Sequence, residues 1–281
     1  MSNYTQLVKS LANALSPAGL AVSQPFPVQR YNNDPACSPY PLPTFDRSHS
    51  TLAILVYNSK SIWEPFIAYL AQDPASRLEG AIVHLSRISQ GCPSNLPSFK
   101  GTSNPLDDFA AKTIESALLN IVPSTTQYLI RYPHNTGKEF VHFQRLCHLS
   151  GTAYRNPNCF LCVHPIHGPW MALRAVIVLD MDGPSPDEAF EEPTNPYPAG
   201  DEAVRERCSN LQQEVDVDAA PIAVALNRRW HELVEIRDLV GGFLGDRVGI
   251  HRYDELQLNY HYSKEKKYLR EAVGQLKETQ C

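Results

Sequence analysis

Two short, uninterrupted apolar runs constrain the fold of this 281-residue chain more than any other feature. Residues 51–57 read T-L-A-I-L-V-Y, and residues 171–179 read M-A-L-R-A-V-I-V-L. A short segment that is apolar at nearly every position is typical of a strand that is buried on both sides. The sequence therefore predicts a sheet that is covered on both faces.

Three further stretches have patterns that predict their structure. Residues 104–122 begin with Asn-Pro, a capping residue followed by a first-turn proline, and continue with helical apolar spacing. Residues 215–276 are also largely helical by pattern. Residues 182–201 are acidic and contain five prolines, a composition that buries too little apolar surface to fold alone. We expect them to form an exposed loop.

Residues 138–154 combine a helical pattern with room for a close contact. Phe140, Phe143, Cys147 and Gly151 fall at i, i+3, i+7 and i+11, so one flank of this predicted helix narrows to a glycine. A glycine lets another group approach the backbone closely. We therefore expect a ligand or another segment at this flank.

Composition bounds the class of protein. With 43% hydrophobic residues, the chain can bury a sizeable core, and its length suits one large domain over residues 1–281. The net charge is only -5 and the basic residues are scattered, so we expect neither nucleic acid nor a membrane as a partner. No run approaches the roughly 20 apolar residues of a membrane span. The seven cysteines lack the spacing of a disulfide framework, which favours reduced thiols in the cytoplasm.

Arg174 interrupts the most hydrophobic predicted strand. A guanidinium in such surroundings needs a carboxylate, a phosphate or a water-filled cavity. Arginine also suits bidentate recognition of anions. Two interpretations stay open, an anion clamp for a ligand and an internal salt bridge.

Several histidines stand in or beside the apolar segments. His148 lies within a predicted helix, where a core role and a functional role both fit. His164 and His167 share a turn, and Cys162 lies on the strand face of His164, so the three could form a metal site with an open position. By contrast, a three-residue offset sends Cys159 and Cys162 to opposite faces of a strand, which argues against a zinc or redox pair.

The usual local motifs of phosphate-binding loops, serine hydrolases and metalloproteases are absent from the sequence. Late in the chain, residues 251–253 (H-R-Y) and 260–262 (Y-H-Y) mix cations with aromatic rings. We interpret these residues as an amphipathic boundary segment.

Two blocks resemble the CblC family of cobalamin-processing proteins (methylmalonic aciduria and homocystinuria type C protein). Residues 148–154 read H-L-S-G-T-A-Y, where the family signature looks like H-V-A-G-A-A-Y. Residues 162–174 read C-V-H-P-I-H-G-P-W-M-A-L-R, where the signature looks like C-I-H-P-x-x-G-G-W-F-A-I-R. Order and spacing within each block match. Shorter similarities extend over most of the chain outside residues 73–103 and 180–237.

The resemblance implies a fold and an activity. The fold is α+β and nitroreductase-like (flavin reductase-like), a central antiparallel sheet flanked by helices, with a corrinoid cavity. The activity is removal of the upper axial ligand of cobalamin, by transfer of an alkyl group to glutathione or by reductive decyanation with reduced FMN or FAD. A downstream cobalamin-trafficking protein is the implied partner, and no metal site of the protein's own is expected.

The residues that match the family's site by position fall into two sets. The catalytic set, which would bind the carboxylates of glutathione, is Arg174 and Arg252. The corrinoid-binding set, in which the small residues leave room for a flat macrocycle, is His148, Ser150, Gly151, Tyr154 and His164.

The chain also departs from the family pattern. After Tyr154 the family continues with Tyr and Gln residues in a hairpin over the corrinoid tail, whereas residues 155–158 (R-N-P-N) lead almost at once to the next strand. Pro169 replaces a glycine, and His167 adds an imidazole. Two alternatives therefore stay open. One is a non-catalytic corrinoid carrier that uses residues 182–201 to contact a partner; the other is a different oxidoreductase or metal-dependent enzyme on the same scaffold.

Overall fold

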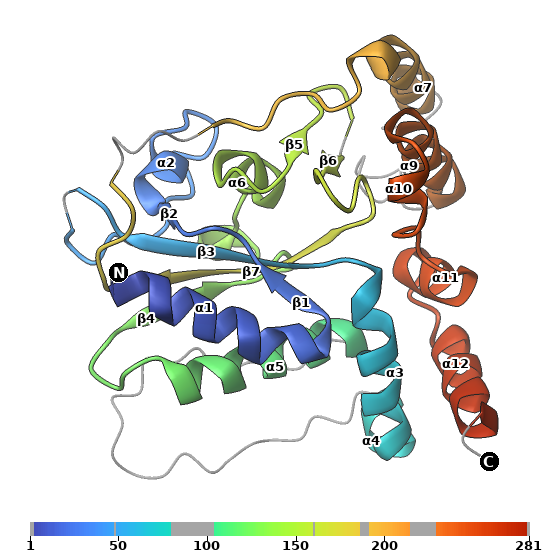
Figure 1. Cartoon of the computed structure of the whole chain (residues 1–281), viewed down its shortest axis with the longest axis horizontal. Helices are drawn as coiled ribbons and strands as arrows, with labels where there is room; N and C mark the ends of the chain where they lie inside the picture. The colour runs from blue at the N-terminus through green and yellow to red at the C-terminus, as the bar shows by residue number, and fades with distance from the viewer. Residues whose placement is uncertain are drawn as a thin grey trace.

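The computed structural model describes residues 3–47, 49–79, 104–159, 161–185, 191–213 and 229–279. At its centre lies an antiparallel sheet with the strand order β1-β3-β7-β4, and β2 also pairs with β3. The strands are β1 Leu20–Val22, β2 Phe26–Pro27, β3 Leu52–Asn58, β4 Tyr128–Arg131 and β7 Ala172–Leu179. Helices lie on both faces of the sheet (Figure 1). The expected α+β class with a central antiparallel sheet is confirmed, and the closer likeness to nitroreductases stays a prediction.

Both apolar runs form central strands, β3 and β7, which pair along their length. Alternate side chains of β3 enter two different cores. Leu52, Ile54 and Val56 pack on one face of the sheet, and Ala53 and Leu55 pack on the other. The run is apolar at every position because neither face meets water, as the sequence predicted.

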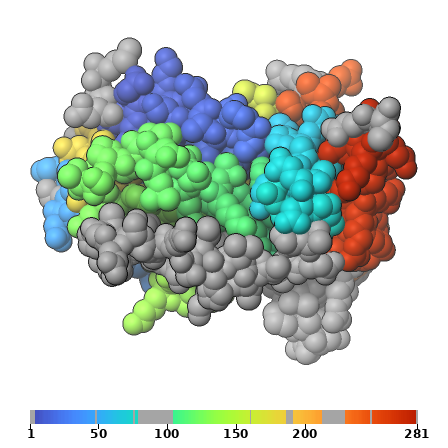
Figure 2. Space-filling model, turned by 90° about the horizontal axis from the view of Figure 1, so that it is seen from below, coloured from blue at the N-terminus to red at the C-terminus, as the bar shows by residue number. Residues whose placement is uncertain are grey.

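One face of the sheet is covered by long helices. They are α1 Asn3–Leu15, α3 Trp63–Gln72, α5 Pro105–Ile121 and α12 Lys266–Thr279, with the short α4 Pro74–Glu79 beside them. Figure 2 shows α1 and α5 side by side on this face, with α3 next to them and α12 beyond α3. The helix α5 starts where the sequence predicts, since the Asn104 side chain accepts the Leu106 N–H at 3.2 Å.

The other face carries α2 Val28–Asn32, α6 Phe143–Leu149 and a small hairpin of β5 Tyr154–Arg155 and β6 Cys162–Val163. The helix predicted over residues 138–154 is therefore too long. It ends early because Gly151 adopts φ +74°, a left-handed conformation that turns the chain out of the helix.

The C-terminal helices run along one end of the sheet (Figure 1). They are α7 Asp201–Gln213, α9 Trp230–Leu244, α10 Asp246–Gly249 and α11 Glu255–Ser263, followed by α12. The helical tail predicted over residues 215–276 is confirmed for residues 229–276, and residues 215–228 lie outside the described part of the chain. Within the acidic segment 182–201, the described residues form coil and one 3₁₀ turn at Pro198–Gly200, and Asp201 begins α7.

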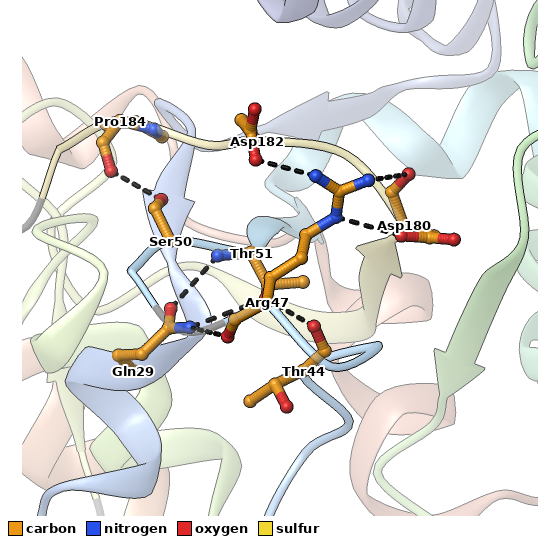
Figure 3. A network of polar contacts seen from close by, with 8 residues as sticks. All are labelled: Gln29, Thr44, Arg47, Ser50, Thr51, Asp180, Asp182 and Pro184. Carbon is orange, nitrogen blue, oxygen red and sulfur yellow. Dashed lines mark hydrogen bonds and ion pairs between the residues drawn. The ribbon is translucent and has the colours of Figure 1, made fainter.

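A polar network fastens the loop before β3 to the end of β7 (Figure 3). Arg47 donates from Nε to the Asp180 carboxylate at 2.8 Å and from Nη1 to Asp182 at 2.6 Å. Ser50 donates to the carbonyl of Pro184 at 2.6 Å. Arg174 lies near the opposite end of β7, about 20 Å away at the usual rise of a strand. The network therefore holds the sheet together away from the candidate site.

Candidate functional site

A pocket of about 300 Å³ opens beside the β5–β6 hairpin, and we refer to it as the hairpin pocket. The residues that line it are Asp34, Arg145, His148, Leu149, Tyr154, Arg155 and Pro157. The helix α6 supplies His148 and the hairpin supplies Tyr154, with 6.3 Å between the ring centroids. Two predicted corrinoid-binding residues are thus brought together. The volume is at the lower end of the range for small-molecule sites.

The imidazole of His148 lines the hairpin pocket with one unpaired nitrogen. Its Nδ1 is buried and has no hydrogen-bond partner among the described residues. Burial lowers the pKa of the imidazole, whereas the carboxylate of Glu192 and a hydrogen bond with the backbone of Ala153 act in the opposite direction. The ring is therefore neutral near pH 7. An unpaired buried polar atom costs roughly 1–3 kcal/mol, so a ligand group that bonds to Nδ1 would explain the placement.

Arginine side chains surround the hairpin pocket. Arg145 forms a two-point ion pair with Asp34, at 3.1 and 2.7 Å, and Arg155 adds a second guanidinium to the lining. Arg30 donates to the backbone carbonyl of Leu149 at 3.1 Å. The pocket thus offers a neutral imidazole, a phenol and positive charge to a polar or anionic group.

Ser150 and Gly151 shape the turn between α6 and the hairpin. The Ser150 side chain is fully buried, and its hydroxyl lies 2.9 Å from the Cys147 carbonyl and 2.7 Å from the Thr152 hydroxyl. Position 151 adopts a positive φ, which favours glycine there. Neither residue lines the hairpin pocket. Their role toward a corrinoid stays a prediction.

Arg174 is buried and bound within the protein. Its Nη1 lies 2.7 Å from the carboxylate of Asp107, in the first turn of α5, and its Nε lies 2.5 Å from the side-chain oxygen of Asn58. The internal salt bridge that the sequence left open is therefore present. The pair with Asp107 explains how the Arg174 guanidinium is tolerated in the apolar strand. Further basic side chains lie near Arg174.

Three basic side chains of the C-terminal region share their electrostatic surroundings with Arg174. Burial lowers the pKa of His261 well below its usual value, and the positive charges of Lys264, Arg237 and Arg174 lower it further. Desolvation of the Lys264 ammonium group lowers its pKa to about 8, and Arg174 acts in the same direction. We refer to Arg174, Arg237, His261 and Lys264 as the basic cluster. Arg174, already paired with Asp107, and the charges of Arg237 and Lys264 favour an anion nearby.

Aromatic rings line the basic cluster. The guanidinium of Arg237 lies 5.8 Å from the ring centre of Trp170 and 5.9 Å from that of Tyr262. The Tyr262 hydroxyl is buried without a hydrogen-bond partner in the described part of the chain. Tyr253 and Tyr260 are almost fully buried. His251, Arg252, His261 and Tyr262 are half-buried, so these late segments have the amphipathic boundary character that the sequence analysis gave them.

The fold was compared with solved structures. It is similar to the crystal structure of the B12-trafficking protein CblC from C. elegans, a human MMACHC homologue, over 96% of this chain and 96% of that chain, with a TM-score of 0.65 and 16% sequence identity. The chain has the fold of CblC. The resemblance predicted from two short blocks is thus confirmed at the level of the fold. No family model and no curated protein matches the sequence.

On this CblC fold, Arg252 lies outside the basic cluster. Its Nε and Nη2 pair with Asp238 at 2.8 and 3.1 Å, and its Nη1 lies 3.4 Å from Glu255. Arg252 is also 5.5 Å from the ring centre of Trp170. Arg237, which sequence analysis missed, is the C-terminal arginine that shares the electrostatic surroundings of Arg174. The role of Arg252 toward glutathione stays a prediction.

His164 shapes the turn between β6 and β7. Its Nδ1 accepts the backbone N–H groups of Ile166 and His167 at 3.0 and 3.3 Å, so the neutral ring carries its proton on Nε2 and donates to the Tyr57 hydroxyl at 3.2 Å. Burial lowers the pKa of His164 to about 4, and the charges of His167 and His251 contribute. Both ring nitrogens are already engaged. Its contact with a corrinoid stays a prediction.

The three metal ligands considered from the sequence do not converge. The Cys162 sulfur lies 3.7 Å from the carbonyl of Gln144 in α6, whereas His164 faces Tyr57. Across the described ranges, no group of three His, Cys, Asp or Glu residues is arranged to hold a metal ion. None of the described helices is long and apolar enough to cross a membrane.

Proposed function

We propose that the protein binds a cobalamin and transfers its upper axial alkyl group to glutathione. The observation that carries this proposal is the likeness to the B12-trafficking protein CblC over nearly the whole of both chains. The hairpin pocket and the basic cluster supply two surfaces of different chemistry, one for each substrate. The free state of the described cysteines fits the cytoplasm as the proposed location.

The hairpin pocket takes part of the corrinoid. A corrinoid is larger than about 300 Å³, so the pocket receives a peripheral group such as the nucleotide tail. His148 bonds to that group through Nδ1, and Tyr154 and Arg155 lie on the hairpin side. A neutral imidazole suits an uncharged amide or hydroxyl, while the arginines suit a phosphate.

The basic cluster holds the thiol substrate. Glutathione carries two carboxylates near neutral pH, and these favour the positive charge of the buried Arg174, the half-buried Arg237 and the exposed Lys264. In the transfer step, the glutathione sulfur forms a bond to the alkyl carbon, the cobalt–carbon bond breaks with its electron pair left on cobalt, and the thiol proton passes to solvent. The protein contributes by holding the two substrates in attack geometry. Reductive decyanation with a reduced flavin is the second reaction in this proposal.

The proposal is tested by incubating the purified protein with methylcobalamin and glutathione under anaerobic conditions. We expect a change in the corrinoid spectrum together with formation of S-methylglutathione. A spectral shift without turnover would support the alternative of a non-catalytic corrinoid carrier. Equilibrium dialysis that recovers all cobalamin as free ligand would contradict the proposal and favour a different enzyme on the CblC fold.

The variant Arg174→Ala distinguishes binding of glutathione from binding of cobalamin. Loss of a charged partner for a carboxylate predicts a roughly 10- to 100-fold rise in the KM for glutathione, with little change in cobalamin affinity. The matched control is Arg131→Ala, which removes a partly buried arginine of the same sheet that pairs with Glu139 at 3.7 Å. Equal loss of cobalamin binding and thiol use in Arg174→Ala would refute the assigned role.

A further inference from the structure

The hairpin and the helix α7 meet at two thiols. Cys159 lies in the loop between β5 and β6, and Cys208 lies on α7. Cys208 belongs to the buried apolar cluster beneath the hairpin, and Cys159 packs against that cluster. The two thiols hydrogen-bond each other. The proposed cobalamin chemistry uses neither of them.

The backbone around Cys159 is held in place. The side-chain oxygen of Asn156 accepts the N–H groups of Asn158 and Cys159 at 2.7 and 3.2 Å, and its amide donates to the Tyr197 hydroxyl at 2.7 Å. The Cys159 carbonyl accepts the N–H of Leu161 at 2.9 Å. The thiol of Cys159 therefore stays near Cys208 without further ordering of the chain, which is the condition for easy disulfide formation.

Access and reactivity differ between the two thiols. Cys159 is half-buried, whereas Cys208 is 2% exposed, so a small reagent reaches the pair from the side of Cys159. The hydrogen bond from Cys159 lowers the pKa of Cys208, the charge of Arg207 contributes, and burial opposes both. The hydrogen bond with Cys208 and burial raise the pKa of Cys159, so the accessible Cys159 attacks a reagent as its proton passes to the Cys208 thiolate.

We propose that Cys159 and Cys208 form a reversible disulfide that ties the hairpin to α7. The oxidant is a small disulfide such as oxidised glutathione. A protein thiolate attacks it and displaces one glutathione thiolate, and the second protein thiol, on losing its proton, then displaces the other. In sum, the two protein thiols lose two electrons and two protons, and one oxidised glutathione becomes two molecules of glutathione.

The proposed bond acts on the wall of the hairpin pocket. The same hairpin that carries Cys159 supplies Tyr154 and Arg155 to that pocket. A covalent link to α7 closes a loop of about 50 residues and restrains this wall. The state of the thiol pool would thereby set how freely the pocket opens.

A second thiol pair provides an internal control. Cys147 and Cys162 also hydrogen-bond each other, which raises the pKa of Cys147. Cys147 is 0% exposed and Cys162 is 8% exposed, and both lie in the core under the sheet. We expect this pair to stay reduced, because the reagent has no path to it.

Disulfide mapping of the full chain tests the proposal. The protein is equilibrated with mixtures of reduced and oxidised glutathione, denatured, blocked with N-ethylmaleimide and digested without reduction. Chymotrypsin is needed because Cys159 and Cys162 share the tryptic segment 156–174, and it cleaves after Phe160 between them. We expect a linked peptide containing Cys159 and Cys208, lost on addition of dithiothreitol.

Variants and exchange measurements complete the test. Cys208→Ser should abolish the linked peptide, and Cys37→Ser, which removes a buried thiol elsewhere, should preserve it. Oxidation should slow hydrogen exchange of residues 154–159 in the parent protein and leave Cys208→Ser unchanged. Recovery of Cys159 and Cys208 as free thiols at the most oxidising mixture, or a preferred Cys147–Cys162 bond, would overturn the proposal. No cobalamin is present, so the outcome is independent of the proposed enzymatic function.

Discussion

Single polar residues in apolar surroundings mark both halves of the candidate site. His148 and Arg174 were found from the sequence because an imidazole and a guanidinium interrupt apolar segments. Lys264 was missed, since its local sequence Y-S-K-E-K looks like an ordinary helix end. The structure brings Lys264 within electrostatic range of Arg174, and desolvation together with that charge lowers the pKa of its ammonium group.

Lys264 predicts a pH dependence of anion binding. Its pKa of about 8 means that the folded protein loses this proton as the pH rises through 8, whereas the unfolded chain keeps it to about 10.4. A bound anion favours the protonated form, so we expect the affinity for S-methylglutathione, which has no ionisable thiol, to fall between pH 7 and 9. Between pH 8 and 10 the unfolded chain binds more protons, so the same shift makes the ligand-free protein more stable as the pH rises.

Isothermal titration calorimetry in buffers of different ionisation heat measures this linkage. Proton uptake on binding should be seen near pH 8.5 in the parent protein. Lys264→Met should bind more weakly at pH 7 and show a smaller fall in affinity up to pH 9. An unchanged slope in Lys264→Met would show that another group is responsible.

At the level of elements, the docking of the C-terminal helices depends on the turn between β6 and β7. This turn carries His164 and Gly168, which form an isolated antiparallel bridge. Gly168 adopts φ +57° and packs directly against Val248 of α10. The turn therefore sets how closely the helices that carry part of the basic cluster approach β7.

Gly168→Ala tests this close approach. An added Cβ would lie 2.2 Å from the Cγ1 atom of Val248, and the positive φ is itself unfavourable for alanine. We expect the free energy of unfolding to fall by roughly 2–4 kcal/mol in urea denaturation. The control is Gly242→Ala in α9, where an added Cβ meets nothing within 4 Å and helix propensity predicts a gain of up to about 1 kcal/mol. Similar effects of the two changes would argue against the tight contact.

At the scale of the whole molecule, the C-terminal helices complete the main core. Tyr260 of α11 and Leu269 of α12 belong to the same buried cluster as Phe66 of α3 and Leu106 of α5. Segments that are nearly 200 residues apart thus share one core. This arrangement favours a single folding domain over residues 1–281.

A single domain predicts one cooperative unfolding transition. Trp63→Phe leaves Trp170 and Trp230, both packed in the cluster formed with the C-terminal helices, as the fluorescent probes. We expect their urea midpoint to coincide with the midpoint from far-ultraviolet circular dichroism, which reports all helices and strands. Two separate midpoints would show that the C-terminal helices unfold independently.

The sequence by itself determined the central strands, the start of α5 and the fold of CblC. Apolar runs and capping residues determine structure through local propensity and burial, so they can be recognised in the sequence. A family signature with fixed spacing can be recognised in the same way. The same reasoning extended the helix over residues 138–154 too far, because it placed Gly151 on a helix flank, whereas Gly151 adopts the left-handed conformation that ends the helix.

Only the tertiary structure decided which charges share a site. Arg174 pairs with Asp107, 67 residues earlier, and its charge acts on Lys264, 90 residues later. Cys159 of the hairpin loop interacts with Cys208 of α7. Desolvation and Coulomb interactions depend on distance in space, and neither leaves a periodic trace in the sequence. The basic cluster and the thiol pair therefore became visible only after the chain had folded.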